Sequence, residues 1–349
     1  MSTTAPTPAT AVPAAAGAAA RLRVSLTTGR GPLLAGRLGL VVLAAAIVLI
    51  VGVNGTSTLR YSLVIGVIYA ITILGNNAIL ATLGEINLAS GAFMAVGAYT
   101  MAYTLSKGWA LPTALLAVIV VSAVIGLLIA VPTVRLTGLF TALATFALAY
   151  AIPDLSLELS AVTGGDAGIS VLPQTVGGEL LDGSSSLMLT IVLVLFVLLA
   201  AASMVLFGRG PGARLLAVGE APHAAASFGL RSTGLKLAVW TWAAVLGGIA
   251  GGAYALTVGF LNPTIFVVFL SISLLAGSLV GGARSAIGAL LGGLLVGALP
   301  SNIQSVVPAS ATGAVFGAVL LIALLAGSGG LGALLERTIL RPFVRSRTA

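Results

Sequence analysis

The chain has 349 residues, of which 59% are hydrophobic and 7% are charged, whereas roughly 25% of residues are charged in soluble domains. It has no cysteine, which excludes disulfides, thiol nucleophiles and sulfur metal sites, and its single histidine, His223, cannot build a zinc site alone. The net charge of +8 is explained by membrane orientation and contact with anionic lipid, and it requires no nucleic-acid partner.

Ten apolar runs follow one another along the chain, each close to the ~20 residues that a helix needs to cross about 30 Å of hydrocarbon. Strands of a membrane barrel would alternate polar and apolar residues, and these runs do not. The sequence therefore predicts an all-α polytopic membrane protein. The predicted spans are residues 38–56, 61–81, 88–106, 111–132, 136–152, 187–207, 237–259, 264–282, 286–304 and 312–330.

The two ends of the chain differ from its apolar middle. Residues 1–20 are mainly Ala, Pro and Thr without charge, so 1–37 is expected to be a disordered, basic cytoplasmic tail. The basic flank of the first span resembles a signal peptide, but nine further spans follow, which favours an uncleaved helix. Residues 38–330 form the predicted transmembrane domain, and 331–349 form a second basic cytoplasmic tail.

Polar residues gather where the second and third predicted spans meet, between and around Gly84 and Gly91. Polar groups in lipid cost several kcal/mol unless they are paired or face water, so this cluster is expected to face inward, beside a solute path. Whether 83–91 re-enters the membrane, or places Glu85 in a cytoplasmic turn, stays open. The candidate path residues are Asn76, Asn77, Glu85, Asn87 and Ser90, with Thr145 and Tyr150 of the fifth span supplying further hydroxyls.

Charged residues separate by side of the membrane. With ten spans and an inward N-terminus, 14 of the 16 lysines and arginines fall in the cytoplasm, and only Arg60 and Lys107 fall outside. The outer loop 153–186 has five acids and neither Lys nor Arg. This pattern predicts a multi-pass protein with both termini in the cytoplasm. The five acids are Asp154, Glu158, Asp166, Glu179 and Asp182.

The cytoplasmic loop 209–236 joins the sixth and seventh predicted spans. Two short helices are expected in it, Ala213–Val218 and Pro222–Phe228, with Pro at the first helical position of the second and Gly229 placed to end it. A compact, Ala-rich helical elbow of this kind has no groups for chemistry. It is therefore expected to be a docking surface.

Enzyme functions fit the chain poorly. Neither lysine belongs to a Gly-Lys-Ser/Thr phosphate loop, because Ser106 precedes Lys107 and Leu235 precedes Lys236. No His or Lys lies within a span to activate a serine. Secondary carriers typically place charged residues inside their spans, and here the span interiors are almost free of charge. A permease energised by a separate ATPase fits better, while an ion-coupled carrier remains the alternative because sodium sites can use backbone carbonyls.

The loop 209–236 resembles the EAA-type coupling loop by which ABC importer permeases hold their ATPase, through Arg214, Gly219-Glu220, Ala224-Ala225 and Gly229-Leu230. Further motifs resemble, in order and spacing, the branched-chain amino-acid (LivH/LivM-type) permease family, LivM in particular, over roughly residues 60–330. Glu85, Arg284 and Ala289 depart from the family pattern, which loosens the substrate assignment. The motifs are 84–93, 97–100, 131–140, 142–145, 163–168, 250–252, Asn262-Pro263, Ser271, Gly281-Gly282, Ser285 and Gly288.

The resemblance implies a type II ABC importer fold of about ten helices in a bacterial inner membrane. Two permease chains, this one with a LivH-like paralogue or a second copy, would receive solute from an extracytoplasmic binding protein. Paired ATPases would bind ATP, so this chain is expected to need no cofactor. The expected solute is a branched-chain or other amino acid, with urea, a short amide, a sugar or a nucleoside as alternatives.

The resemblance also assigns two expected contact surfaces. The ATPase is expected to meet the elbow, and the binding protein is expected to meet acids of the outer loop, although topology alone would also explain their charge. The ATPase-coupling candidates are Arg214, Glu220, Ala224, Ala225 and Gly229, and the docking candidates are Asp154, Glu158 and Asp166.

Overall fold

The computed structural model describes residues 30–136, 138–208, 210–230 and 232–303, together with 317, 318, 321, 330–332 and 335. Helices dominate the described chain, and the few strands are two residues long. The elements are α2 (Arg30–Asn54), α3 (Ser57–Leu83), α4 (Ser90–Ser106), α5 (Leu111–Thr133), α6 (Leu139–Glu158), α7 (Ser160–Thr163), η1 (Gly165–Ala167), β1 (Ile169–Ser170), β2 (Thr175–Val176), β3 (Glu179–Leu180), α8 (Ser186–Gly208), α9 (Gly210–Glu220), α10 (Pro222–Ser227), α11 (Ser232–Val258), β4 (Phe260–Leu261), η2 (Pro263–Phe266), α12 (Val268–Gly281) and α13 (Ala286–Ile303).

The predicted helical membrane fold is confirmed. A helix occupies each of the first nine predicted spans, and among the described residues six helices are long and apolar enough to cross a membrane. Helices α12 and α13 are shorter apolar helices. Most of the predicted tenth span, 312–330, lies outside the described residues, as do residues 1–29 and most of 331–349.

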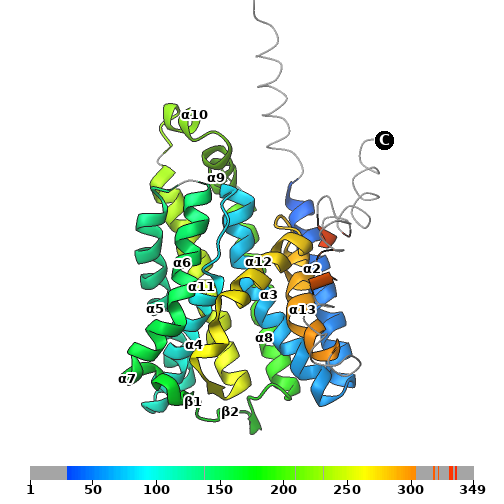
Figure 1. Cartoon of the computed structure of the whole chain (residues 1–349). Coiled ribbons are helices and arrows are strands. Elements are labelled where there is room, and N and C mark those ends of the chain that lie inside the picture. The colour runs from blue at the N-terminus through cyan, green and yellow to red at the C-terminus, as the bar shows by residue number, and fades with distance from the viewer. Residues whose placement is uncertain are drawn as a thin grey trace, which may run out of the picture.

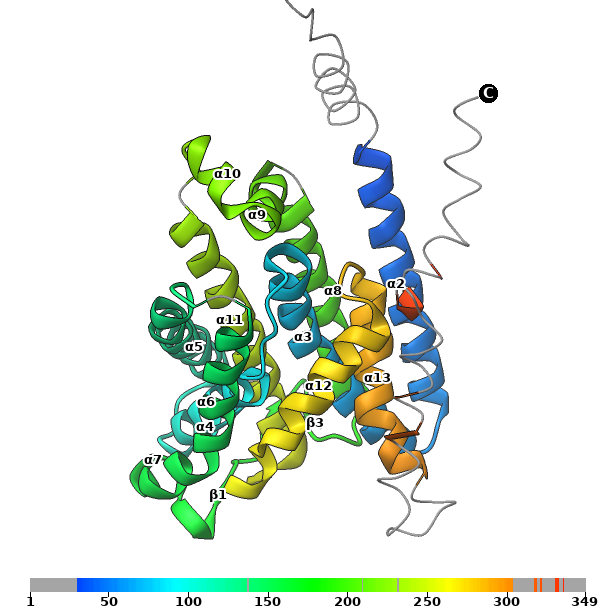
Figure 2. The same ribbon diagram turned by 45° about the horizontal axis from the view of Figure 1, so that its top comes forward.

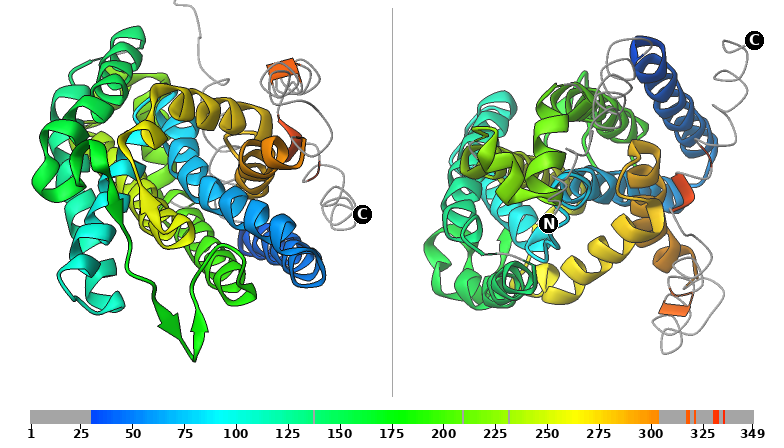
Figure 3. Two further views of the ribbon diagram at one scale, coloured as in Figure 1. Left: turned by 60° about the horizontal axis from the view of Figure 1, so that its bottom comes forward. Right: turned by 90° about the horizontal axis from the view of Figure 1, so that it is seen from above.

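The helices form a bundle with two distinct ends (Figure 1). The short helices α9 and α10 project at one end, and α7 with the strands lies at the other. Helices α3 and α11 are largely buried at the centre, whereas α2, α5 and α8 bury a third of their residues or fewer, as lipid-facing helices do. Seen along the bundle, α2 stands at its edge beside α13 (Figure 3, right).

The same order of elements occurs twice in the chain. Helices α3 and α11 each have 27 residues, and each ends at a left-handed glycine, Gly84 or Gly259, whose N–H bonds the carbonyl four residues earlier. A shorter helix and then a longer one follow in both cases. Corresponding ends are 175 positions apart: Ser57 and Ser232, Leu83 and Val258, Ser106 and Gly281, and Leu111 and Ala286.

The two copies run in opposite directions through the bundle. Helix α11 starts directly after α10, whereas α3 finishes against α9, where a Cβ on Gly219 would lie 2.4 Å from the Thr82 carbonyl oxygen. The sequence repeats at the same offset, since Gly84-Glu85-Ile86-Asn87 corresponds to Gly259-Phe260-Leu261-Asn262. This arrangement is an inverted repeat, the kind that places broken helices from both halves inside a transporter.

Small residues bring the central helices together, as their clustering on α11 suggests. A Cβ on Gly251 would lie 1.9 Å from the Met94 carbonyl oxygen of α4, and a Cβ on Gly248 would lie 1.9 Å from the Ser122 hydroxyl of α5. Larger side chains would therefore force these helices apart. Close approach of this kind is how membrane helices gain packing contacts without a hydrophobic driving force.

Candidate functional site

The elbow, α9 and α10, rests on the end of the membrane bundle. The side chains of Leu215 and Val218 are buried beneath α9, and Gly219 contacts the last turn of α3. Helix α9 is longer than predicted, because it covers Gly210–Glu220 rather than Ala213–Val218. The elbow is therefore fixed to α3 by packing as well as by its covalent links to α8 and α11.

The predicted end of the second short helix at Gly229 is confirmed. Gly229 has a φ of 75°, its N–H bonds the Ala226 carbonyl at 2.9 Å, and the Leu230 N–H bonds the Ala225 carbonyl at 3.1 Å. These two bonds form a Schellman motif, which satisfies carbonyls that the helix end would otherwise leave open. Glycine suits this position because other L-residues are strained at positive φ.

The structure separates the ATPase-coupling candidates into exposed and buried residues. Arg214 and Glu220 are exposed on α9. Ala225 is only 3% exposed, so its side chain packs the elbow and contributes no surface, and the side chain of Ala224 lies outside the described residues. Sequence analysis missed Phe228, which is 86% exposed at the end of α10. The sequence could have indicated Phe228, because an aromatic residue directly precedes the helix-ending Gly229 in a loop that is expected to dock a partner.

A buried ion pair links the base of the elbow to the segment after α3. Lys236 Nζ lies 2.6 Å from Glu85 Oε1, and the Trp240 indole N–H donates to Glu85 Oε2 at 3.2 Å. The side chain of Glu85 is 6% exposed and that of Lys236 is 12% exposed. Both carboxylate oxygens of Glu85 are therefore occupied by donors from the first turns of α11, which follows directly from the elbow.

Residues 84–89 form an extended stretch between α3 and α4 (Figure 2). The Leu88 N–H donates to the Thr145 hydroxyl of α6 at 3.1 Å, and the Gly91 N–H donates to the Ser271 hydroxyl of α12 at 2.9 Å. Side chains thus replace the helical bonds that this backbone lacks, as a break inside a membrane protein requires. Thr145 is six residues into α6, or about 9 Å along it, so the break lies below the bundle surface.

The break brings four of the candidate path residues together. Besides Glu85 and Thr145, Asn87 and Ser90 are buried there, with the Asn87 amide donating to the Ser90 hydroxyl at 3.4 Å and its oxygen accepting from the Ala89 N–H at 2.8 Å. Hydrogen bonds connect the break and the start of α4 to α6, α11 and α12. Sequence analysis anticipated the polar cluster but could not choose between a turn and a buried break.

The remaining candidate path residues lie elsewhere. Asn76 and Asn77 are buried on α3, and the Asn77 side-chain oxygen accepts a hydrogen bond from the Ser278 hydroxyl of α12. Tyr150 is 67% exposed on α6, where Thr145 is buried, so its hydroxyl does not join the cluster. The α-helical period of 3.6 residues explains this, because positions five apart point in different directions.

The docking candidates lie together at the end of the bundle opposite to the elbow, which faces the viewer in Figure 3, left. Asp154 and Glu158 are exposed on the last turns of α6, and Asp166 is exposed in η1. None of the three forms an ion pair with another described residue. The predicted loop 153–186 begins later than expected, because α6 continues through Pro153 to Glu158.

Similarity to known proteins agrees with this architecture. A family model described as the permease component of the branched-chain amino acid transport system matches residues 58–324. The chain is 31% identical over 252 residues to the high-affinity branched-chain amino acid transport system permease protein LivM of Salmonella typhimurium, and 29% identical over 252 residues to LivM of Escherichia coli. Each match covers 64% of this chain and 58% of the relative's length. No solved structure matches the chain.

Proposed function

Because the chain belongs to the family of branched-chain amino acid transport permease components, which are transport subunits and not enzymes, we propose that it is the membrane-spanning subunit of an ABC importer for branched-chain or other amino acids. A binding protein delivers the solute, separate ATPases bind ATP, and a second permease chain completes the path. LivM of the two named species carries branched-chain amino acid transport in its name, which supports this solute class.

The observation that carries the proposal is the physical connection between the elbow and the broken segment. The elbow presents exposed Arg214, Glu220 and Phe228, and it packs on the end of α3 through Gly219. Helix α11 continues from the elbow, and its Lys236 holds Glu85 at the start of the break. An ATPase that moves the elbow therefore also moves the broken segment and the first turn of α4, which are hydrogen-bonded to α6 and α12.

The charge distribution supports one orientation. The elbow side carries exposed Arg37, Arg135, Arg214 and Arg284 among the described residues, which favours the cytoplasm for that side. The exposed acids at the other end then face the binding protein. In this orientation the start of α2 lies on the cytoplasmic side, and we propose that the chain spans the inner membrane of a bacterial cell with both termini in the cytoplasm.

The solute path is proposed to follow the break between α3 and α4, beside Asn87, Ser90 and Thr145. Hydroxyl, amide and backbone groups at this position suit the carboxylate and ammonium of an amino acid. Glu85 is occupied by Lys236, so we assign it to positioning the break. A family member for urea, a sugar or a nucleoside would share the same architecture and differ in the binding protein.

Binding of ATPase subunits to the elbow tests the proposal. We expect Phe228→Glu to lower ATPase affinity at least tenfold, because it removes an exposed aromatic contact and adds charge at the interface centre, where single residues contribute about 2 kcal/mol or more. Affinity is measured by biolayer interferometry with the purified permease in nanodiscs. Lys107→Glu, at the opposite end of the bundle, is the control and leaves affinity unchanged.

Uptake measurements in proteoliposomes distinguish ATP-driven transport from ion-coupled transport. The wild-type protein, combined with its permease partner, ATPases and binding protein, is expected to take up leucine only when ATP is supplied on the elbow side. Uptake without ATP, driven by a sodium or proton gradient, would show that the chain is an ion-coupled carrier instead.

A further inference from the structure

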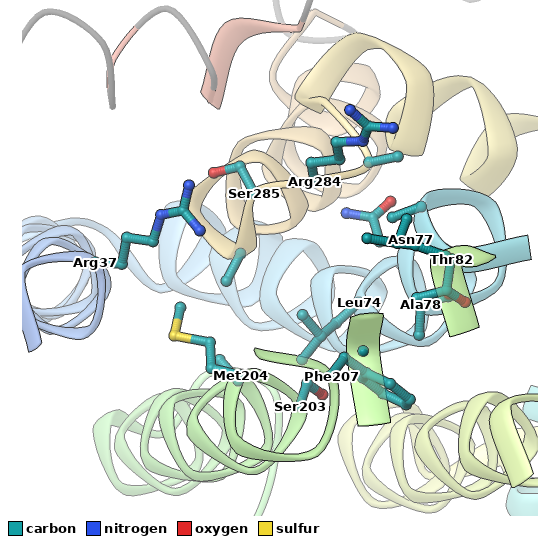
Figure 4. Close-up of a pocket in the computed structure, with 16 residues that line it drawn as sticks. Arg37, Leu74, Asn77, Ala78, Thr82, Ser203, Met204, Phe207, Arg284 and Ser285 are labelled. Atoms are coloured by element: carbon teal, nitrogen blue, oxygen red, sulfur yellow. The ribbon is translucent and has the colours of Figure 1, made fainter. Parts of the chain in front are cut away.

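A cavity of about 280 Å³ opens at the elbow end of the bundle, apart from the break at 84–89. Helices α2, α3, α8 and α9 and the turn between α12 and α13 surround it (Figure 4). Its polar lining includes Arg37 of α2, Asn77 of α3 and Arg284 of the turn. Apolar side chains of α3 and α8, among them Leu74, line another part of the wall. The cavity is therefore amphipathic.

A buried hydrogen-bond donor faces this cavity without a partner. Asn77 is 4% exposed, and its oxygen is occupied by the Ser278 hydroxyl. Its amide nitrogen, Nδ2, has no hydrogen-bond partner within the part of the chain that the structure describes. A buried amide without an acceptor is unfavourable, so a ligand oxygen placed in the cavity would relieve it.

The positively charged residues around the cavity favour an anionic ligand. Arg37 and Arg284 both line it, and the described lining includes no Asp or Glu. Ala286, the first residue of α13, also lines it, so the positive end of that helix dipole is turned to the same space. Guanidinium, amide and helix N-terminus together favour a phosphate-type anion, which accepts hydrogen bonds on several oxygens.

The apolar wall favours a lipid over a soluble anion. Met204 and Phe207 of α8 lie on the cavity side that Figure 4 draws opposite Arg284, where an acyl chain could pack. Helix α2 carries exposed Leu43 and Ile47, as a helix in contact with hydrocarbon does. We propose that this cavity binds the phosphate headgroup of an anionic phospholipid from the leaflet on the elbow side, as basic pockets between membrane helices do.

Native mass spectrometry of the purified permease with defined lipids tests this site. The probes are phosphatidylglycerol and phosphatidylcholine with identical acyl chains. The wild-type protein is expected to retain phosphatidylglycerol preferentially, and Arg284→Gln is expected to lower that retention about fivefold, the effect of one arginine near an anionic headgroup. Arg135→Gln, an exposed arginine in the turn after α5, is the matched control and retains lipid as the wild type does.

A second variant and two competitors complete the test. Arg37→Gln is expected to lower retention in the same way, and it keeps the test decisive if Arg284→Gln does not fold. Equal retention of both lipids, or unchanged retention in both arginine variants, would overturn the proposal. Displacement of the lipid by inorganic phosphate at millimolar concentration would overturn it in favour of a soluble anion, and displacement by leucine would assign the cavity to the solute path.

Discussion

Glu85 and Lys236 lie 151 positions apart in the sequence, yet their side chains form a buried ion pair 2.6 Å long. Each charge is tolerated because the other is present, and Trp240 satisfies the second carboxylate oxygen. Removing one partner leaves an uncompensated buried charge, which costs far more than the pair contributes when complete. At the scale of single residues, this pair fixes where the broken segment sits relative to α11.

Single and double replacement of this pair should differ sharply. We expect Lys236→Met to destabilise the permease by about 3 kcal/mol, because Glu85 would be left charged and buried. Combining it with Glu85→Gln should recover most of that loss, as thermal unfolding in detergent would show. Lys107→Met, at an exposed lysine, is the control and should change stability by less than about 0.5 kcal/mol. Additive losses in the double variant would contradict the pairing.

At the scale of elements, the extended segment 84–89 is the feature that distinguishes this bundle from a set of continuous spans. Helix α4 begins only at Ser90. The backbone before it is held by the Thr145 hydroxyl of α6, and the first turn of α4 is held by the Ser271 hydroxyl of α12. These bonds join three elements that are far apart in sequence. A shift of α3 or α11 under the elbow would therefore be transmitted to the break, while the packed glycine contacts keep α4 and α11 together.

Cysteine labelling can measure the solvent accessibility of this break, because the chain has no cysteine of its own. We expect Asn87→Cys, Ser90→Cys and Thr145→Cys to react with a small hydrophilic thiol reagent in a manner that changes with ATP and loaded binding protein. Ala102→Cys, on the buried face of α4 away from the break, is the control and should stay unreactive. If all three positions remain unreactive in every state of a transporting protein, the solute path lies elsewhere.

At the scale of the whole molecule, charge is sorted between the two ends of the bundle. The exposed acids of α6 and η1 lie at one end, and the elbow lies at the other, together with the exposed arginines Arg37, Arg135, Arg214 and Arg284. Opposite charges on a partner would speed encounter with the acidic end, and this effect weakens with salt because exposed charges are screened over about 10 Å at 0.1 M ionic strength.

Neutralising the acidic end should slow uptake in a salt-dependent way. We expect the combined change Asp154→Asn, Glu158→Gln and Asp166→Asn to lower the uptake rate several-fold at low ionic strength and to have little effect at about 1 M salt, where the screening length is ~3 Å. Initial rates of leucine uptake in proteoliposomes at both salt concentrations provide the measurement. An unchanged rate at low salt would mean that these acids reflect topology alone.

The sequence by itself determined the membrane class, the positions of nine helices, the elbow and its end at Gly229. These features depend on local chemistry, since a long apolar run has one stable form in lipid and a glycine ends a helix wherever a left-handed residue is needed. The family could also be identified from short motifs, because the order of these motifs along the chain is more specific than any single motif.

Only the tertiary structure decided which polar residues meet. Lys236 pairs with Glu85, Thr145 binds the extended segment, Ala225 packs inward and Tyr150 points outward. Each outcome depends on the rotation and depth of helices packed against one another, which the apolar pattern leaves undefined when a helix is hydrophobic on all sides. The inverted repeat became clear in the same way, because corresponding helix ends identify the 175-residue offset that few shared residues mark in the sequence.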